Sequence, residues 1–144
     1  MRRSDLLTQA CDPKTLTVGQ VMQDAVFTCT TKTDALTIGR LMTRQNFGSL
    51  PVLEEDGTVV GLVSEYDLLQ AMIDGRDLRK IKALDIMTTH PQTTTESMAL
   101  TEVATLFQDR YLTRLPVLRE KKLVGIVARR DLLQGYMKAS DYFS

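Results

Sequence analysis

A serine and an aspartate three residues apart, Ser64 and Asp67, carry the first chemistry that this sequence suggests. They belong to the phrase GLVSEYD at residues 61–67, where a β-rich run gives way to a helical pattern. Because three residues make about one helical turn, both side chains point the same way. The carboxylate offers two acceptor oxygens to the adjacent hydroxyls of a ribose, and the serine hydroxyl suits ribose or phosphate at a helix N-terminus. The same spacing fits a capping box, with Asp in place of the usual Glu or Gln, so ribose binding and helix capping both stay open.

The phrase recurs 64 positions later as GIVARRD, with Ala128 in place of the serine. Alanine offers no hydroxyl and is a poorer N-cap than serine by about 1 kcal/mol. Asp131 is retained, and it either holds a ribose by itself or only stabilises the helix N-terminus through the helix dipole. We call Ser64 with Asp67 the first corner, and Ala128 with Asp131 the second corner.

The residue before the repeated LPVL phrase also differs, being Ser49 in the first copy and Arg114 in the second. A guanidinium fork fits phosphate oxygens, so Arg114 is a candidate phosphate ligand; the alternative is an arginine that only faces solvent.

His90 is the only histidine, and no cysteine or carboxylate cluster accompanies it, which argues against a metal site. The sequence also lacks a Ser-His-Asp set, a Cys-His set and a glycine-rich phosphate loop, so we expect a protein that is not an enzyme.

These residues belong to a duplication that runs along the chain. Its offset is 65 residues up to LPVL and 64 afterwards, because the turn that follows is one residue shorter in the second copy. Each copy has a short β-prone run, a helical periodicity, two β-rich runs joined by a tight turn, and a second helix. We therefore predict an α/β (α+β) fold of two β-α-β-β-α repeats, packed with pseudo-twofold symmetry to cover their apolar sheet faces. The predicted repeats are residues 14–74 and 80–138, with tails at 1–13 and 139–144, a short helix within 5–10, and hairpins at 50–63 and 115–127.

Composition excludes several broad classes. The chain has 144 residues, 43% hydrophobic and 25% charged, which is ordinary for one globular domain or two small ones that share a core. Basic and acidic residues both number 18, so the net charge of zero argues against a nucleic-acid surface and permits self-association. Cys11 and Cys29 fit neither a disulfide framework nor a metal motif, and we expect reduced thiols. A polar N-terminus and the lack of a long apolar run argue against a secretory signal and a membrane span, so we expect a soluble cytoplasmic protein.

Three pairs of phrases resemble the CBS domain, a module named after cystathionine β-synthase. They are VMQDAVFT and IMTTHPQT, SLPVL and RLPVL, and GLVSEYDLL and GIVARRDLL, in the same order within each copy. The two copies together resemble a Bateman module in a stand-alone CBS-domain protein. The resemblance implies a non-catalytic regulatory sensor with clefts between its repeats for an adenine nucleotide or adenosyl ligand: AMP, ADP, ATP, NAD or S-adenosylmethionine. It further implies a homodimer, a protein target that the sequence does not name, and no required cofactor.

The resemblance also implies roles for individual residues. It assigns the first corner to a ribose and Arg114 to the phosphates of a ligand held by Asp131, with each adenine slot borrowed from the opposite repeat. The implied neighbours are Ala25, Phe47 and Gly48 for the cleft of Asp131, His90, Leu112 and Thr113 for the first corner, and Leu62 and Ile126 beside the sugars. For the apolar members of this set the alternative is plain core packing. For the glycine it is relief of the backbone, and for the histidine a place in a loop beside proline.

The unequal corners leave a second function open, a structural dimerisation module whose clefts bind nothing. The alanine of the second corner and the missing arginine of the first copy favour it. Heat released on titration with adenine nucleotides distinguishes the sensor from this module.

Overall fold

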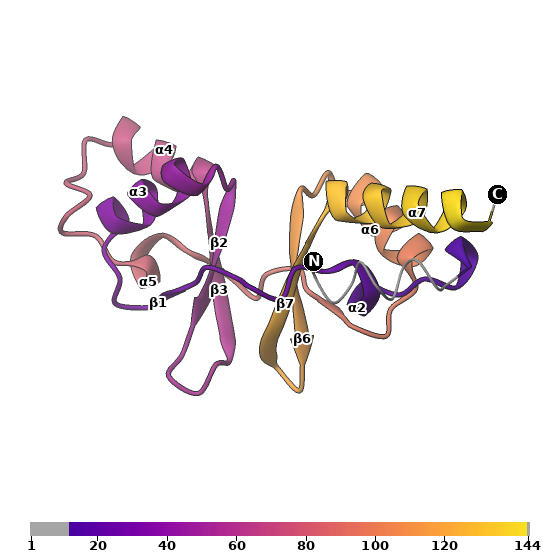
Figure 1. Cartoon of the computed structure of the whole chain (residues 1–144). Helices are drawn as coiled ribbons and strands as arrows, with labels where there is room; N and C mark the ends of the chain where they lie inside the picture. Colours follow the sequence, from indigo (N-terminus) through magenta and orange to yellow (C-terminus); the bar gives the residue numbers. More distant parts are fainter. Residues whose placement is uncertain (1–11, 144) are drawn as a thin grey trace. The chain divides into compact units, whose positions relative to one another are not determined.

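The computed structural model describes residues 12–143 of the chain (Figure 1). Two expectations, the short helix within residues 5–10 and the reduced thiol of Cys11, lie outside the described residues. None of the helices within residues 12–143 has the length and apolar character that crossing a membrane requires.

The described chain divides into two compact units. The first unit is residues 27–91, and the second unit combines residues 12–26 with residues 92–143. The boundaries of these units differ from those of the sequence repeats, because the opening segment of each repeat folds onto the sheet of the other repeat. These opening segments are residues 14–26 of the first repeat and 80–91 of the second.

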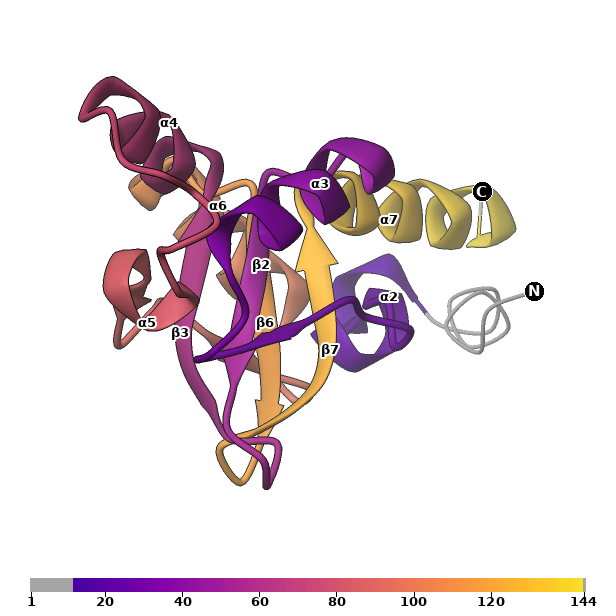
Figure 2. The same ribbon diagram turned by 90° about the vertical axis from the view of Figure 1, so that its left-hand side faces the viewer.

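The first unit contains a four-stranded sheet with strand order β1-β2-β3-β4, whose two long strands, β2 and β3, are labelled in Figures 1 and 2. Strands β1 and β2 are parallel, whereas β2–β3 and β3–β4 are antiparallel. Strand β4 comes from the opening segment of the second repeat, so it adds to the sheet of the first. The elements are β1 (Cys29–Thr30), α3 (Ala35–Gln45), β2 (Ser49–Leu53), β3 (Val59–Ser64), α4 (Glu65–Ile73), α5 (Ala83–Ile86) and β4 (Thr88–Thr89).

The second unit repeats this plan with a three-stranded sheet of order β5-β6-β7. Strands β5 and β6 are parallel and β6–β7 antiparallel. An isolated bridge between Gln23 and Ile126 attaches the opening segment of the first repeat to β7. The elements are η1 (Pro13–Thr15), α2 (Val18–Val21), β5 (Thr94–Thr95), α6 (Leu100–Arg110), β6 (Arg114–Arg119), β7 (Lys122–Ala128) and α7 (Arg129–Phe143).

The predicted β-α-β-β-α order is confirmed in both repeats, and so are the two hairpins. The first hairpin turns through Gly57, whose φ of 89° is easy for glycine. The second has a two-residue turn in which Glu120 and Lys121 both have positive φ, 52° and 69°, the geometry that matches strand twist in tight hairpins. The short helices α2 and α5, which the periodicity does not predict, are the main addition.

The boundaries of the two long central helices follow from local chemistry. Asp34 caps α3, accepting hydrogen bonds from the Thr37 backbone nitrogen at 2.9 Å and its hydroxyl at 2.7 Å. These bonds, the hydroxyl first, hold the pKa of Asp34 below its ordinary value. Helices α3 and α6 both end at a left-handed residue, Asn46 with φ 57° and Tyr111 with φ 53°.

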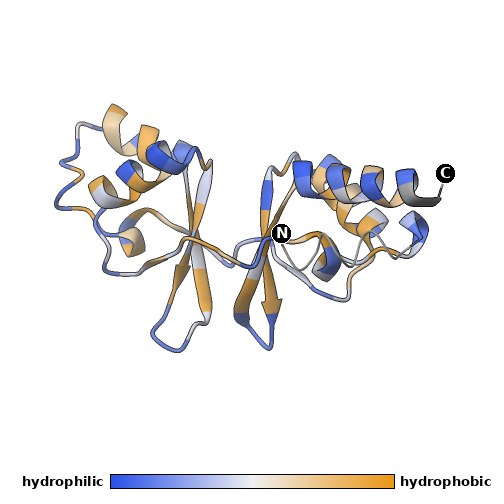
Figure 3. Ribbon diagram, viewed as in Figure 1, coloured by the Kyte–Doolittle hydropathy of each residue, from blue (hydrophilic) through white to orange (hydrophobic). Residues whose placement is uncertain are grey.

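Each unit has its own hydrophobic core, and hydrophobic and hydrophilic residues alternate along the covering helices (Figure 3). The opening segment of each repeat contributes to the core of the opposite repeat. Leu16, Val18 and Val21 join the core of the second unit, and Ala83 joins that of the first. Burial of a valine or leucine side chain contributes about 1.5–3 kcal/mol, so Leu16, Val18 and Val21 stabilise the position of the opening segment of the first repeat.

The repeated glycine of the corner phrases marks the places where these opening segments cross the sheets. A Cβ atom on Gly61 would collide with the side chain of Met87. A Cβ atom on Gly125 would lie 2.6 Å from the Met22 sulfur and 2.8 Å from the Gln23 carbonyl oxygen. Only glycine lets the crossing segment approach this closely, which explains why the glycine occurs in both phrases.

Candidate functional site

The first corner forms a capping box at the start of α4. The Asp67 carboxylate accepts hydrogen bonds from the Ser64 backbone nitrogen at 2.8 Å and from its hydroxyl at 3.0 Å. The Ser64 hydroxyl oxygen in turn accepts from the Asp67 backbone nitrogen at 3.3 Å. The capping interpretation of this spacing is therefore confirmed. A carboxylate has about four lone-pair sites, so the cap leaves acceptor capacity for a ligand.

Asp67 also lines a polar pocket of about 210 Å³ within the first unit. Asp67, Gln70 and Asp74 lie on one face of α4, at spacings of three and four residues. Arg76 and Asp85 line the same pocket. Three carboxylates and one guanidinium make this pocket a better partner for hydroxyl or amino donors than for a bare anion. No group of three or more His, Cys, Asp or Glu side chains within residues 12–143 is arranged to hold a metal ion.

The second corner is organised differently. Its aspartate, Asp131, is only 4% exposed. Its Oδ2 accepts a hydrogen bond from the Ala128 backbone nitrogen at 2.9 Å, which is the carboxylate half of a capping box. The Gln23 side-chain amide reaches the same group from the opening segment, at 3.1 Å from Oδ1 and 3.2 Å from Oδ2.

Arg114 lies beside the second corner, as the first residue of β6 and paired with Ala128. The residue is half-buried, so it is not an arginine that only faces solvent. Burial lowers the pKa of Arg114, and the charge of Asp131 opposes that shift. Arginine keeps its charge at neutral pH under such conditions, so a positive group stands next to the carboxylate. The matching residue of the first repeat, Ser49, pairs with Ser64 and is 6% exposed.

The loops before the hairpins lie at the corners of their own units. The Gly48 carbonyl accepts a hydrogen bond from the Glu65 backbone nitrogen at 3.0 Å, and the Thr113 carbonyl accepts from Arg129 at 3.3 Å. The Phe47 ring packs against Phe27 with centroids 5.7 Å apart. Assignment of Phe47, Gly48, Leu112 and Thr113 to the opposite corners remains a prediction.

The opening segments bring the other predicted residues into the units. Strand β4 pairs Thr88 with Leu62 of β3, which places the following His90 in the unit of the first corner. His90 is exposed, with φ 51°, in a loop before proline. Ala25 is exposed two residues after Gln23, in the unit of the second corner. Leu62 is half-buried, whereas Ile126 is 1% exposed.

Sequence reasoning overlooked Gln23, the residue that contacts Asp131. The only signal was its position: Gln23 follows Val21-Met22 just as Thr88 follows Ile86-Met87. The 65-residue offset therefore makes Gln23 and Thr88 equivalent, and the difference between them marks a difference between the two units.

Comparisons with known proteins agree with this architecture. The family model of the CBS domain matches residues 18–74 and again residues 83–138. YlbB of Bacillus subtilis, an uncharacterised protein, is 40% identical over 88 residues, 60% of this chain and 60% of YlbB. MK0525 of Methanopyrus kandleri, also uncharacterised, is 30% identical over 123 residues, 84% of this chain and 63% of that protein. The chain thus spans about three-fifths of the length of both relatives.

Solved structures share the fold. CBSX2 in complex with AMP has a TM-score of 0.76 at 27% identity, covering 87% of this chain and 98% of that chain. CBSX2 from Arabidopsis thaliana, solved as a CBS-pair protein, has a TM-score of 0.78 at 27% identity, covering 88% of this chain and 97% of that chain.

Proposed function

Because this chain belongs to the CBS domain family and carries the domain twice, we propose that it is a regulatory module for an adenine nucleotide or a related adenosyl compound. The first corner is the observation that carries this proposal. Asp67 is half-buried at a helix N-terminus, beside a polar pocket, and the opening segment of the other repeat pairs with the strand that leads to it. CBSX2, a relative of the same fold at 27% identity, was solved with AMP.

We propose that Asp67 accepts the two ribose hydroxyls while it keeps its bonds to Ser64. A ligand held in this way stabilises the folded first unit by mass action, and a separate protein target reads the shift in population.

Isothermal titration calorimetry with AMP, ADP, ATP, NAD and S-adenosylmethionine tests the proposal. We expect at least one compound to bind, Asp67→Ala to weaken its binding tenfold or more, and Ser64→Ala to weaken it less, because the carboxylate makes the two-oxygen contact. Asp34→Ala is the matched control, since it removes a helix cap in the same unit without touching the corner. Neither heat nor a thermal shift with any of the five compounds would overturn the proposal.

The proposed role is regulatory and non-catalytic. Nucleotide incubated with the protein and recovered by chromatography should therefore be chemically unchanged. Conversion of any of the five compounds at a rate that depends on the second or first corner would contradict this part of the proposal.

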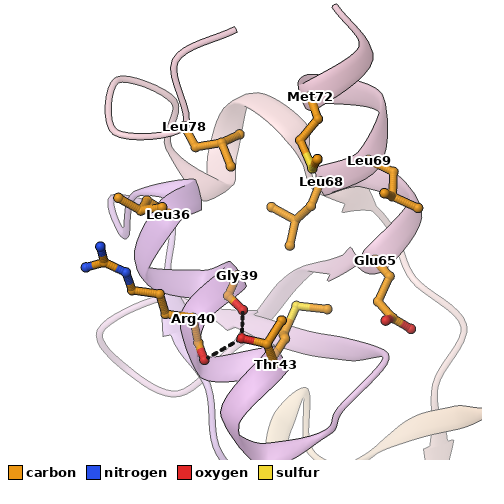
Figure 4. A pocket seen from close by; sticks show the side chains of 10 residues that line it. Leu36, Gly39, Arg40, Thr43, Glu65, Leu68, Leu69, Met72 and Leu78 are labelled. Carbon is orange, nitrogen blue, oxygen red and sulfur yellow. Dashed lines mark hydrogen bonds between the residues drawn. The ribbon is translucent and has the colours of Figure 1, made fainter. Parts of the chain in front are cut away.

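An exposed apolar surface supports self-association as a second candidate function. A groove of about 330 Å³ lies between α3 and α4 in the first unit (Figure 4). Two of its α4 residues, Leu69 and Met72, are 49% and 60% exposed, and the adjacent Ile73 is 77% exposed. We propose a second copy of this chain as the occupant, because a net charge of zero opposes no such pairing and the same patch on both partners makes a closed dimer. The groove is lined by Leu36, Gly39, Arg40, Met42, Thr43, Glu65, Leu68, Leu69, Met72 and Leu78.

Sedimentation velocity measures this candidate directly. We expect the wild type to sediment as a dimer and Met72→Glu to shift it toward the monomer, because the carboxylate would be buried without a partner. Lys32→Glu, an exposed change away from the groove, should leave the sedimentation coefficient unaltered. A wild type that is monomeric across the concentration range would exclude the dimer.

A further inference from the structure

The carboxylate of the second corner is already occupied by the chain itself. The Gln23 amide nitrogen lies 3.1 Å from Oδ1 and 3.2 Å from Oδ2 of Asp131. These are the two oxygens that a pair of ribose hydroxyls would need, and the amide nitrogen of Gln23 lies within hydrogen-bond distance of both. The Ala128 backbone nitrogen donates to the same carboxylate, and Asp131 is only 4% exposed.

The backbone holds the glutamine in this position. The Gln23 nitrogen donates to the Ile126 carbonyl at 2.8 Å, and the Ile126 nitrogen donates to the Gln23 carbonyl at 2.8 Å. Gly125 beneath the bridge lets the segment lie this close to β7. Because the backbone of Gln23 is fixed beside Asp131, its side chain reaches the carboxylate at little entropic cost, and a ligand must compete with a neighbour that is always present.

The first corner has no such glutamine. Thr88 pairs with Leu62 just as Gln23 pairs with Ile126, so the two positions are equivalent. The Thr88 side chain is two atoms shorter and exposed. Asp67 takes its side-chain hydrogen bonds from Ser64 within its own corner and remains half-buried.

We propose that Gln23 determines occupancy: it holds the Asp131 carboxylate, so the second corner takes an adenosyl ligand only when the glutamine withdraws, and the first corner fills before it. This inference rests on the proposed function, because it assumes that the ligand carries a ribose. The glutamine acts through Asp131 and is not itself a ligand-binding residue. Charge-assisted hydrogen bonds of this kind correspond to tenfold or more in an equilibrium constant, which sets the expected difference between the corners.

Calorimetric titrations with AMP and, separately, S-adenosylmethionine test this in an Asp67→Ala background that silences the first corner. We expect no measurable binding in Asp67→Ala. The double variant Asp67→Ala with Gln23→Thr, which copies the residue at position 88, should bind at least tenfold more tightly than the weakest binding that the titration can detect. Adding Asp131→Asn should abolish the recovered binding, which assigns it to the second corner. Circular dichroism melts establish that each variant is folded.

The converse variant, Thr88→Gln in the otherwise wild-type chain, tests the same idea at an exposed position where folding is not at risk. It should weaken binding at the first corner about tenfold or more, since the longer amide reaches toward Asp67. Two results overturn the inference while the proposed function stands. In the first, the wild type binds but Gln23→Thr restores no binding in the Asp67→Ala background. In the second, Thr88→Gln leaves the affinity of the first corner unchanged. If the wild type binds neither compound, the proposed function fails and this inference fails with it.

Discussion

Replacing Gly125 with alanine tests how the opening segment is attached to the second unit. The added Cβ would lie 2.6 Å from the Met22 sulfur and 2.8 Å from the Gln23 carbonyl oxygen, where relaxed carbon contacts need about 3.5 Å or more. The sulfur can swing away, but the carbonyl belongs to the backbone. Its movement breaks the two 2.8 Å hydrogen bonds between Gln23 and Ile126.

The expected loss follows from these contacts. Overpacking of this kind costs about 1–3 kcal/mol, and each broken backbone bond adds about 1 kcal/mol. The two costs do not add in full, because the structure relaxes in part. We therefore expect Gly125→Ala to lower the free energy of unfolding by about 2–4 kcal/mol, where the total for a protein of this kind is about 5–15 kcal/mol. Urea unfolding followed by far-UV circular dichroism, at constant m-value, measures the change.

Gly61→Ala is the matched control, because the three atoms nearest to a Cβ there all belong to the Met87 side chain and none to the backbone. Gly61→Ala should lower the free energy of unfolding by less than Gly125→Ala does. When it is measured against Met87→Ala instead of the wild type, its cost should fall below about 0.5 kcal/mol. Met22→Ala should rescue Gly125→Ala only in part, because the Gln23 carbonyl remains. Equal stability of Gly125→Ala and the wild type, or full rescue by Met22→Ala, would refute the reasoning.

Three further changes follow from local chemistry. Burial raises the pKa of the Cys29 thiol from 9.0 to about 12, so its contribution to stability is present below pH 9 and lost as pH rises toward 12. Relative to Cys29→Ala, the unfolding free energy of the wild type should fall by at most about 1.4 kcal/mol per pH unit above pH 9 in urea titrations. Tyr111→Asn should stabilise the chain by about 0.5–1 kcal/mol, because asparagine tolerates the left-handed conformation that Asn46 adopts at the equivalent position. Ala128→Ser should raise the melting temperature through a cap worth about 1 kcal/mol, as Ser64 provides for α4.

Each of these outcomes has a clear contrary. If the unfolding free energy depends on pH identically in the wild type and in Cys29→Ala, the thiol pKa is the same in the folded and unfolded chains. Loss of stability in Tyr111→Asn would mean that the exposed ring, not the backbone, decides that position. An unchanged or lower melting temperature in Ala128→Ser would mean that the hydroxyl accepts no hydrogen bond from the backbone at the start of α7.

The sequence predicted the repeated β-α-β-β-α order and both hairpins, because these features depend on short-range patterns. Each of these patterns is contained within about a dozen positions: apolar residues at helical spacing, runs of β-branched residues, and the one-residue difference in a turn. The first corner was predictable for the same reason, since Ser64 and Asp67 meet within a single turn of helix.

Only the tertiary structure showed which side chain contacts the carboxylate of the second corner, because the resemblance pointed to Ala25 there and not to Gln23. Gln23 and Asp131 are 108 residues apart, and no periodicity in the chain links them. The repeat itself suggested boundaries at which each copy keeps its own opening segment. Packing instead lays each segment across the other repeat's sheet, against Gly61 and Gly125. Local patterns specify elements, but the choice between equivalent partners depends on which surfaces fit, and that is settled only when the distant segments meet.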